Sequence, residues 1–336
     1  MIRAGPVGLL GSAPFAGPVR RPRAGDAGSA SVPRKALPRA GPAEQTGRMT
    51  SLPASPTAVL GTPGSAPPLV ISSYTLGTEV PFRARVAAAA AAGFDGIGLR
   101  AENYWDAREA GLDAATMSEI AAGAGVPVRE VEYLTGWGTA DDRTADQRRK
   151  ERTVVEMAHA FGVRHLNAGL LEHLPVERIT EAFAELCDRV GPGLTVALEF
   201  MPYSGVPDLA TAGRVVRDAG RANGALIVDV WHWARAGMTA ADLTSVPAGS
   251  IVAVQLCDVL AEPMTPLRAE SLGHRLPPGQ GYGDAAGMVR ALHDHGVRPA
   301  VVTAEVISDA LVAGGIEQAA RTAHRASVDV LLAAGA

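Results

Sequence analysis

Cysteine is scarce in this chain of 336 residues, which contains only Cys187 and Cys257. Two cysteines cannot build a disulfide framework or a cysteine-rich zinc site, and so low a count suits a reducing compartment. No apolar run approaches the roughly 18 residues that a membrane-spanning helix needs. Residues 7–17 are short, are broken by Pro14 and are preceded by a single arginine, so they fit neither a secretory nor a twin-arginine signal. We therefore expect a cytoplasmic protein without a membrane partner.

Basic charge is confined to the start of the chain. Residues 1–68 contain eight Lys or Arg and two Asp or Glu, whereas residues 69–336 contain 23 basic and 33 acidic residues. A nucleic-acid groove needs clustered positive charge to neutralise phosphates. The net charge of −10 on residues 69–336 therefore argues against a nucleic-acid partner.

Two regions of different composition divide the chain. Residues 1–68 are rich in Ala, Gly, Pro, Ser and Arg and show no apolar periodicity, so they cannot bury enough surface to offset the entropy of ordering. We expect them to form a disordered tail. Residues 69–336 then form one globular domain, for which the 47% of hydrophobic residues is ample.

Short apolar runs alternate with amphipathic segments through residues 69–336. The runs predict strands at 69–73, 96–99, 126–133, 164–168, 194–199, 225–229, 251–256 and 299–305. The intervening segments predict helices at 80–92, 112–124, 141–161, 176–190, 207–222, 239–244, 284–295 and 316–334. Eight βα units in this length are typical of a closed (β/α)₈ TIM barrel of about 250 residues. The alternative is a doubly wound open sheet, but no glycine-rich phosphate turn follows the first strand.

Four consecutive strands end on residues that can ligate a metal: Glu199, Asp229, Gln255 and Glu305. Each shares a strand face with the residue two positions before it, since side chains alternate along a strand. In barrels the active site lies at the carboxyl ends of the strands. Three carboxylates brought together there cannot all stay ionised unless a positive charge holds them. Oxygen-rich ligation favours Mg²⁺ or Mn²⁺ over Zn²⁺ or Co²⁺.

Sequence motifs after these strands give a more specific indication. They read Leu198-Glu199-Phe200, Asp229-Val230-Trp231-His232, Val254-Gln255-Leu256-Cys257-Asp258, Arg275-Leu276-Pro277-Pro278-Gly279-Gln280-Gly281 and Ala304-Glu305-Val306. This pattern resembles the xylose isomerase-like TIM barrels of the sugar phosphate isomerase and epimerase superfamily, the AP endonuclease family 2 type. The resemblance covers about residues 69–336 and is strongest in the second half.

The resemblance implies metal ligands at Glu199, Asp229, Gln255 and Glu305. In the mechanism that we expect, Glu199 and Glu305, on opposite sides of this ligand cluster, serve as catalytic base and acid. Members of the superfamily commonly have His at the third ligand position, so Gln255 is a departure, although its carbonyl oxygen suits a hard cation. His232 matches a histidine that contacts substrate oxygens in relatives. Arg275 matches an arginine that approaches substrate hydroxyl or phosphate groups.

Several further residues have two interpretations each. Arg268 competes with Arg275 for the same role, and a satisfied loop histidine is the alternative for His232. Glu132 follows Glu130 on the third strand and either lines the substrate pocket or forms a buried ion pair. Four tryptophans that follow strand ends either wall the pocket or pack in the core, namely Trp105, Trp137, Trp231 and Trp233. Cys257 is expected to be a small buried hydrophobic residue.

The function that the resemblance implies is a divalent-metal-dependent sugar or sugar-phosphate isomerase or epimerase. It would abstract a proton next to a carbonyl through a metal-stabilised enediolate. A dehydratase of an inosose or 3-dehydroshikimate-like substrate uses the same residues and is the first alternative. A non-catalytic barrel that binds a sugar without metal is the second, because of Gln255. The substrate is then a small polyol, sugar or sugar phosphate, and relatives suggest a homodimer.

Overall fold

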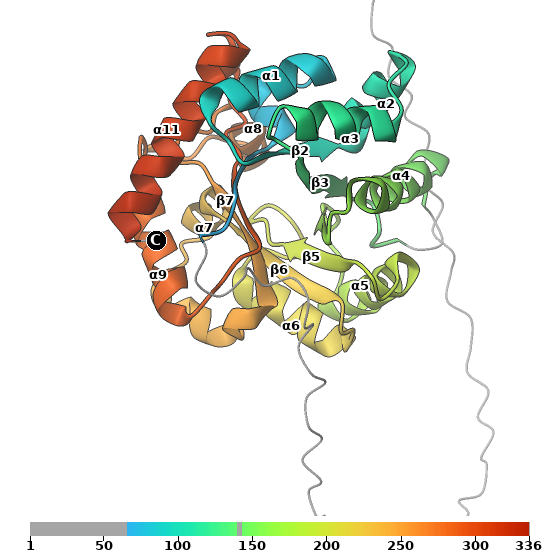
Figure 1. Cartoon of the computed structure of the whole chain (residues 1–336). Coiled ribbons are helices and arrows are strands. Elements are labelled where there is room, and N and C mark those ends of the chain that lie inside the picture. The colour runs from blue at the N-terminus through green and yellow to red at the C-terminus, as the bar shows by residue number, and fades with distance from the viewer. Residues whose placement is uncertain (1–65, 140–142, 336) are drawn as a thin grey trace, which may run out of the picture. The chain divides into compact units, whose positions relative to one another are not determined.

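The computed structural model describes residues 66–139 and 143–335. Within them the chain forms eight parallel strands, which close into a barrel in the order of the sequence (Figure 1). The strands are β1 (Leu69–Ile71), β2 (Gly96–Arg100), β3 (Val128–Leu134), β4 (His165–Gly169), β5 (Thr195–Glu199), β6 (Gly224–Asp229), β7 (Ile251–Leu256) and β8 (Val301–Ala304). The closed sheet confirms the predicted TIM barrel and excludes the doubly wound open sheet.

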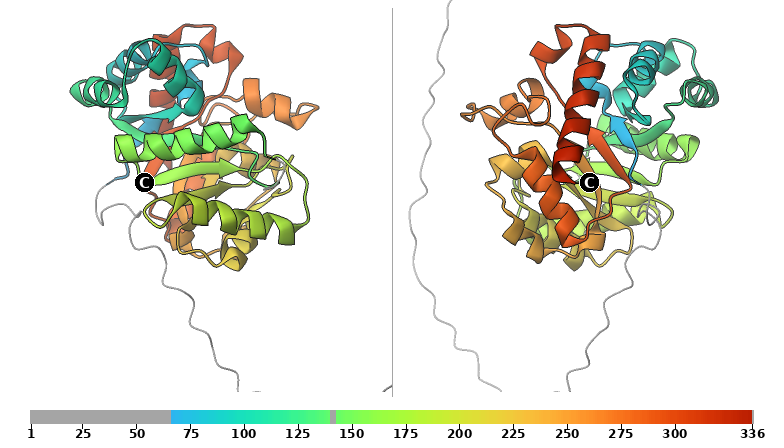
Figure 2. Two further views of the ribbon diagram at one scale, coloured as in Figure 1. Left: turned by 90° about the vertical axis from the view of Figure 1, so that its right-hand side faces the viewer. Right: turned by 60° about the vertical axis from the view of Figure 1, so that its left-hand side comes forward.

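Helices surround the barrel and cover the outer face of the sheet (Figures 1 and 2). Those expected from the sequence are α1 (Phe82–Ala92), α3 (Ala114–Gly123), α4 (Ala145–Phe161), α5 (Val176–Val190), α6 (Leu209–Ala219), α9 (Ala285–His295) and α11 (Ile316–Ala334). The helix predicted at 239–244 is instead the 3₁₀ helix η2 (Ala240–Ser245). Shorter elements that were not predicted are α2 (Ala101–Glu109), α7 (Val230–Arg235), α8 (Leu267–Gly273), α10 (Asp309–Val312) and the 3₁₀ helices η1 (Ser73–Leu76) and η3 (Ala248–Ser250).

Local chemistry explains where the long helices begin and which face they bury. Thr144 and Gln147 form a capping box at the start of α4: the Thr144 hydroxyl accepts from the Gln147 amide N–H, and the Gln147 side chain accepts from that of Thr144. In α5 the buried residues Ile179, Phe183 and Leu186 recur at helical spacing and pack against the sheet. Amphipathic faces of this kind anchor the outer layer of the barrel.

The strands are buried on both faces, which explains their nearly continuous apolar runs. The main core lies between the sheet and the helices. A second cluster of mostly small side chains includes Ala197, Ile227 and Ala253, which share their strand faces with Glu199, Asp229 and Gln255. On these strand faces, the polar side chains of Glu199, Asp229 and Gln255 therefore follow apolar residues and lie at the carboxyl ends of the strands.

The structure does not decide whether the tail is disordered or whether the protein is cytoplasmic. The tail predicted at 1–68 lies outside the described residues, except for residues 66–68. In the part of the chain that is described, no helix is both long and apolar enough to cross a membrane.

Candidate active site

The four predicted ligands lie at the carboxyl ends of neighbouring strands. Glu199 and Asp229 are the last residues of β5 and β6, Gln255 is the fifth of six residues in β7, and Glu305 directly follows β8. The register pairs Asp229 with Gln255 across β6 and β7. All four side chains are buried, with Asp229 fully so. The strand geometry thus brings them to one end of the barrel.

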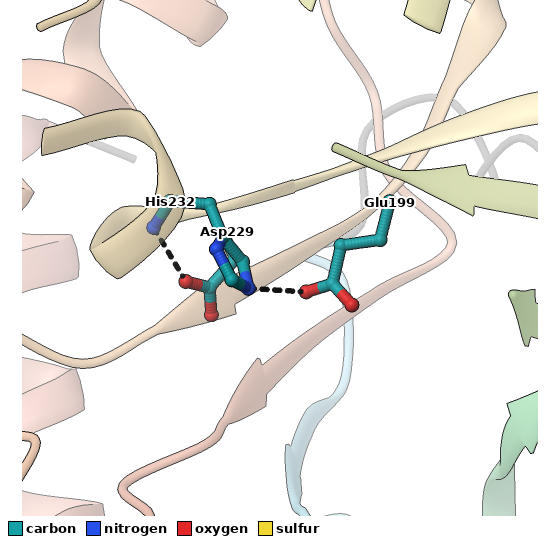
Figure 3. A group of neighbouring side chains, drawn as sticks. All are labelled: Glu199, Asp229 and His232. Carbon is teal, nitrogen blue, oxygen red and sulfur yellow. Dashed lines mark hydrogen bonds and ion pairs between the residues drawn. The ribbon is translucent and has the colours of Figure 1, made fainter. Parts of the chain in front are cut away.

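Glu199, Asp229 and His232 form the group best suited to hold a metal ion (Figure 3). One potential ligand atom from each lies within 4.8 Å of those of the other two. Asp229 caps helix α7, because its Oδ1 accepts from the His232 backbone N–H at 3.0 Å. This turn directs the His232 ring toward Glu199, with 3.4 Å between Nε2 and Oε1. His232, predicted to contact substrate, therefore also lies among the potential ligand atoms.

Arg275 lies between Asp229 and Glu305. Its Nη1 is 2.9 Å from Asp229 Oδ2 and 3.2 Å from Glu305 Oε2, and its Nε donates to the Ser271 carbonyl at 2.9 Å. Arg275 is 2% exposed, whereas the competing Arg268 is exposed. The structure therefore places Arg275 in the site and Arg268 outside it.

A second arginine, Arg100 at the end of β2, reaches the same cluster from the other side. Its Nη2 is 3.0 Å from Glu132 Oε2 and 3.1 Å from Glu305 Oε1. The guanidinium also stacks over the ring of Tyr74, 4.0 Å from its centroid. Although Glu132 Oε2 is close to Arg100, neither oxygen of Glu132 has the alignment of a hydrogen bond. Of the two readings of Glu132, the structure shows the buried ion pair, with Arg100, while its place in the lining of a substrate pocket stays a prediction.

Tyr133 holds Glu199 in place. The Tyr133 hydroxyl donates to Glu199 Oε2 at 2.6 Å. Gly169 on β4 makes room for it, because a Cβ at position 169 would lie 1.8 Å from the Tyr133 hydroxyl oxygen. A glycine on one strand therefore allows the hydrogen bond between two others.

The surroundings shift the pKa values of the two predicted catalytic glutamates in opposite directions. Burial alone would raise the pKa of Glu199, but His232, Tyr133 and Arg275 outweigh it and hold that pKa below its usual range. Burial raises the pKa of Glu305 despite the opposing charges of Arg275 and Arg100. Burial also raises the pKa of Glu132 well above its usual range, with Arg100 opposing.

The charges and unpaired atoms of the cluster match a divalent cation. Four buried carboxylates, those of Glu132, Glu199, Asp229 and Glu305, face the two guanidinium groups of Arg100 and Arg275. Ionisation of all six groups would leave two negative charges, and the raised pKa values of Glu132 and Glu305 indicate that this state is unfavourable without a further cation. Among residues 66–139 and 143–335, the Gln255 carbonyl oxygen and Glu199 Oε1 also lack a hydrogen-bond partner. The donor set therefore fits a metal such as Mn²⁺, Mg²⁺, Zn²⁺ or Co²⁺.

The remaining sequence interpretations are decided by burial. Trp137 and Trp231 are buried in the core, where their indole N–H groups donate to the Gly169 carbonyl and to Glu270. Trp233 is also buried in the core, while Trp105 is half-buried and packs against α4. Cys257 is buried as predicted.

Arg100 and Tyr133 are the site residues that the sequence reasoning missed. Both stand at or near a strand end, and that position is the signal that could have identified them.

Comparisons with known proteins agree with this architecture. A family model described as xylose isomerase-like TIM barrel matches residues 86–333. A comparison with curated protein sequences finds no match.

Three solved structures illustrate the similarity. The IolI protein, solved with a bound zinc atom, is 21% identical over 79% of this chain and 98% of its own, with a TM-score of 0.71. An L-ribulose 3-epimerase is 17% identical over 80% of this chain and 95% of its own, with a TM-score of 0.61. D-psicose 3-epimerase of Clostridium cellulolyticum H10, solved with D-tagatose, is 14% identical over 80% and 99%, with a TM-score of 0.57. At these identities the structures show a shared fold.

Proposed function

Because the chain belongs to the family of xylose isomerase-like TIM barrels, we propose that it is a divalent-metal-dependent isomerase or epimerase of a small sugar or polyol. The observation that carries the proposal is the buried cluster of Glu199, Asp229 and His232 at the carboxyl ends of the strands. It occupies the end of the barrel where enzymes of this fold carry their active sites.

Glu199, Asp229 and His232 would hold the metal. The Gln255 carbonyl oxygen, which accepts no hydrogen bond from the described part of the chain, would complete the set. A divalent ion bound there supplies Lewis-acid stabilisation of negative charge that develops on a substrate oxygen. Glu305 is less free to bind it than the sequence suggests, because both of its oxygens face arginines.

Glu199 and Glu305 would exchange protons with the substrate carbon next to the carbonyl. Glu199 is the base, since Tyr133 and His232 favour its ionised form. Glu305 is the acid, since its pKa is raised while Arg100 and Arg275 keep its carboxyl group oriented. Proton removal on one face of the carbon and return on the other gives epimerisation, and return to the neighbouring carbon gives isomerisation.

The charge pairing favours an uncharged substrate over a sugar phosphate. Arg100 and Arg275 each already face two carboxylates, so neither is left to neutralise a phosphate. A dianionic phosphate would add two negative charges beside four buried carboxylates. Free ketoses or polyols with a carbonyl group are the expected class.

A metal-free sugar-binding barrel is the second candidate, because one structural observation favours it. The guanidinium of Arg275 bridges Asp229 and Glu305, which gives these carboxylates a counter-charge from within the chain. Gln255 also replaces the usual histidine ligand of the superfamily.

Metal analysis followed by isotope exchange tests the proposal. Purified protein should contain or be activated by a divalent ion, and Asp229→Asn should lose it, whereas the control Asp294→Asn at an exposed position should retain it. With metal present, ketoses incubated in deuterated water should gain deuterium at the carbon next to the carbonyl. Binding of sugar with neither metal nor deuterium uptake would support the second candidate and refute the first.

A further inference from the structure

A cavity of about 270 Å³ opens at the opposite end of the barrel from the candidate active site. It lies at the amino ends of β3, β4 and β8, where Val128, His165 and Val301 are the first residues of their strands. Its size is near the lower limit of small-molecule pockets, which suits a small metabolite.

Two arginines, Arg129 and Arg164, line this cavity. Arg129 belongs to β3, Arg164 directly precedes β4, and both side chains are exposed. Among residues 66–139 and 143–335, neither arginine has a carboxylate oxygen within 4.0 Å. Arg129 uses its Nε for the Asp95 carbonyl, and its two Nη groups donate to no residue in the same described part of the chain.

Apart from the two arginines, the described residues of the lining include one polar side chain, that of His165. No Asp or Glu lines the cavity among the described residues. His165, which is 2% exposed, contributes to the lining, and its Nε2 has no hydrogen-bond partner within the residues that the structure describes. The nearest carboxylate oxygen to that nitrogen, in Glu130, is 3.7 Å away. The cavity thus combines two exposed arginines, which have no carboxylate within 4.0 Å in the described part of the chain, with a buried imidazole that lies 3.7 Å from Glu130.

We propose that this cavity, here called the basal cavity, binds the phosphate group of a small molecule between Arg129 and Arg164. Guanidinium groups match the geometry of phosphate oxygens, and two of them neutralise a dianion. The net charge of −10 on residues 69–336 disfavours a nucleic acid as the source of that phosphate. The ligand is therefore free phosphate or a small phosphate monoester, and it binds without blocking the sugar site.

Calorimetric titration of the intact protein tests the assignment. The probes are inorganic phosphate, glycerol 3-phosphate and, as a carboxylate control, malonate, each at ionic strength matched with NaCl. Wild-type protein should bind at least one of the two phosphates and bind malonate more weakly. Tighter binding of glycerol 3-phosphate identifies a monoester site, and tighter binding of inorganic phosphate identifies a site for the free ion.

Variants locate the bound phosphate. Arg129→Gln and Arg164→Gln should each weaken binding by about tenfold or more, and the double variant should abolish it. Arg325→Gln, at an exposed position on α11, is the matched control and should bind as wild type does. Circular dichroism checks that each variant is folded, and the single variants keep the test informative if the double variant is not. Absence of phosphate binding, equal binding of malonate, or unchanged binding in the single variants would overturn the proposal.

Discussion

The hydrogen bond from Tyr133 to Glu199 provides a direct test of how the candidate site is held together. Tyr133→Phe removes the hydroxyl that donates to Glu199 Oε2 at 2.6 Å and leaves the ring in place. A hydrogen bond to a charged group contributes about 1.5–3 kcal/mol to stability. In a domain of this size each kcal/mol shifts the melting temperature by about 2–4 °C. The expected loss is therefore about 3–12 °C in metal-free protein at pH 7.

The effect on stability should depend on pH in a defined direction. Interactions that lower the pKa of Glu199 in the folded state contribute stability above its ordinary value of 4.5, and this stability is lost as pH falls through the folded-state pKa. The difference between wild type and Tyr133→Phe should therefore be largest near neutral pH and shrink in acid. In the active enzyme, the acidic limb of the kcat/KM profile should move to higher pH, because Glu199 loses a group that lowers its pKa.

Urea denaturation at several pH values measures this difference, and Tyr282→Phe is the matched control. Tyr282 is 75% exposed, so its substitution should change the free energy of unfolding by less than about 0.5 kcal/mol. If Tyr133→Phe is as stable as the control at pH 7, the bond to Glu199 does not hold the site and the reasoning is wrong.

Four further predictions follow from the same geometry. Glu305→Gln should lower kcat at least about 100-fold with the fold intact, since it removes a proton-transfer group; full activity in a steady-state assay would show that Glu305 is misassigned. Gln255→His should retain or tighten metal binding, as measured by competition with a chelating dye, and a loss of metal would contradict its role as ligand. Glu132→Gln should raise the melting temperature more at pH 8 than at pH 5, because a buried carboxyl with a raised pKa loses stability as pH rises above its ordinary value; an equal gain at both values would argue against a raised pKa. Neither thiol should react with a thiol reagent at pH 8 before unfolding, since burial raises the pKa of Cys187 to about 12 and that of Cys257 well above its usual range; rapid labelling of native protein would refute this.

The fold could be predicted because its signals are local. A parallel strand buried on both faces is a short apolar run, and each of the eight runs is visible without knowledge of its neighbours. Boundaries were less exact where the pattern is weak. The strand predicted at 299–305 spans only Val301–Ala304, and α7, with six residues, is too short to show helical periodicity.

The site was predictable only in part, because its contacts are distant in sequence. The position of Glu199, Asp229, Gln255 and Glu305 at one end of the barrel follows from the rule that strands end at the active face. Which charges pair there does not follow, since Arg100 meets Glu305 across 205 residues of sequence. Likewise the contact of Tyr133 with Glu199 depends on a missing side chain at Gly169, which becomes evident only when the strands are side by side.

The side chain of Asp229 has two roles, and this determines which substitutions the protein tolerates at position 229. One oxygen starts helix α7, and the other faces the cation of Arg275. In a library of all substitutions at this position, most variants would lose both stability and activity. Asparagine is the exception, because it caps a helix as well as aspartate does but carries no charge. A mutational scan that measures both the abundance and the activity of each variant would thus separate the role of Asp229 in folding from its role in function.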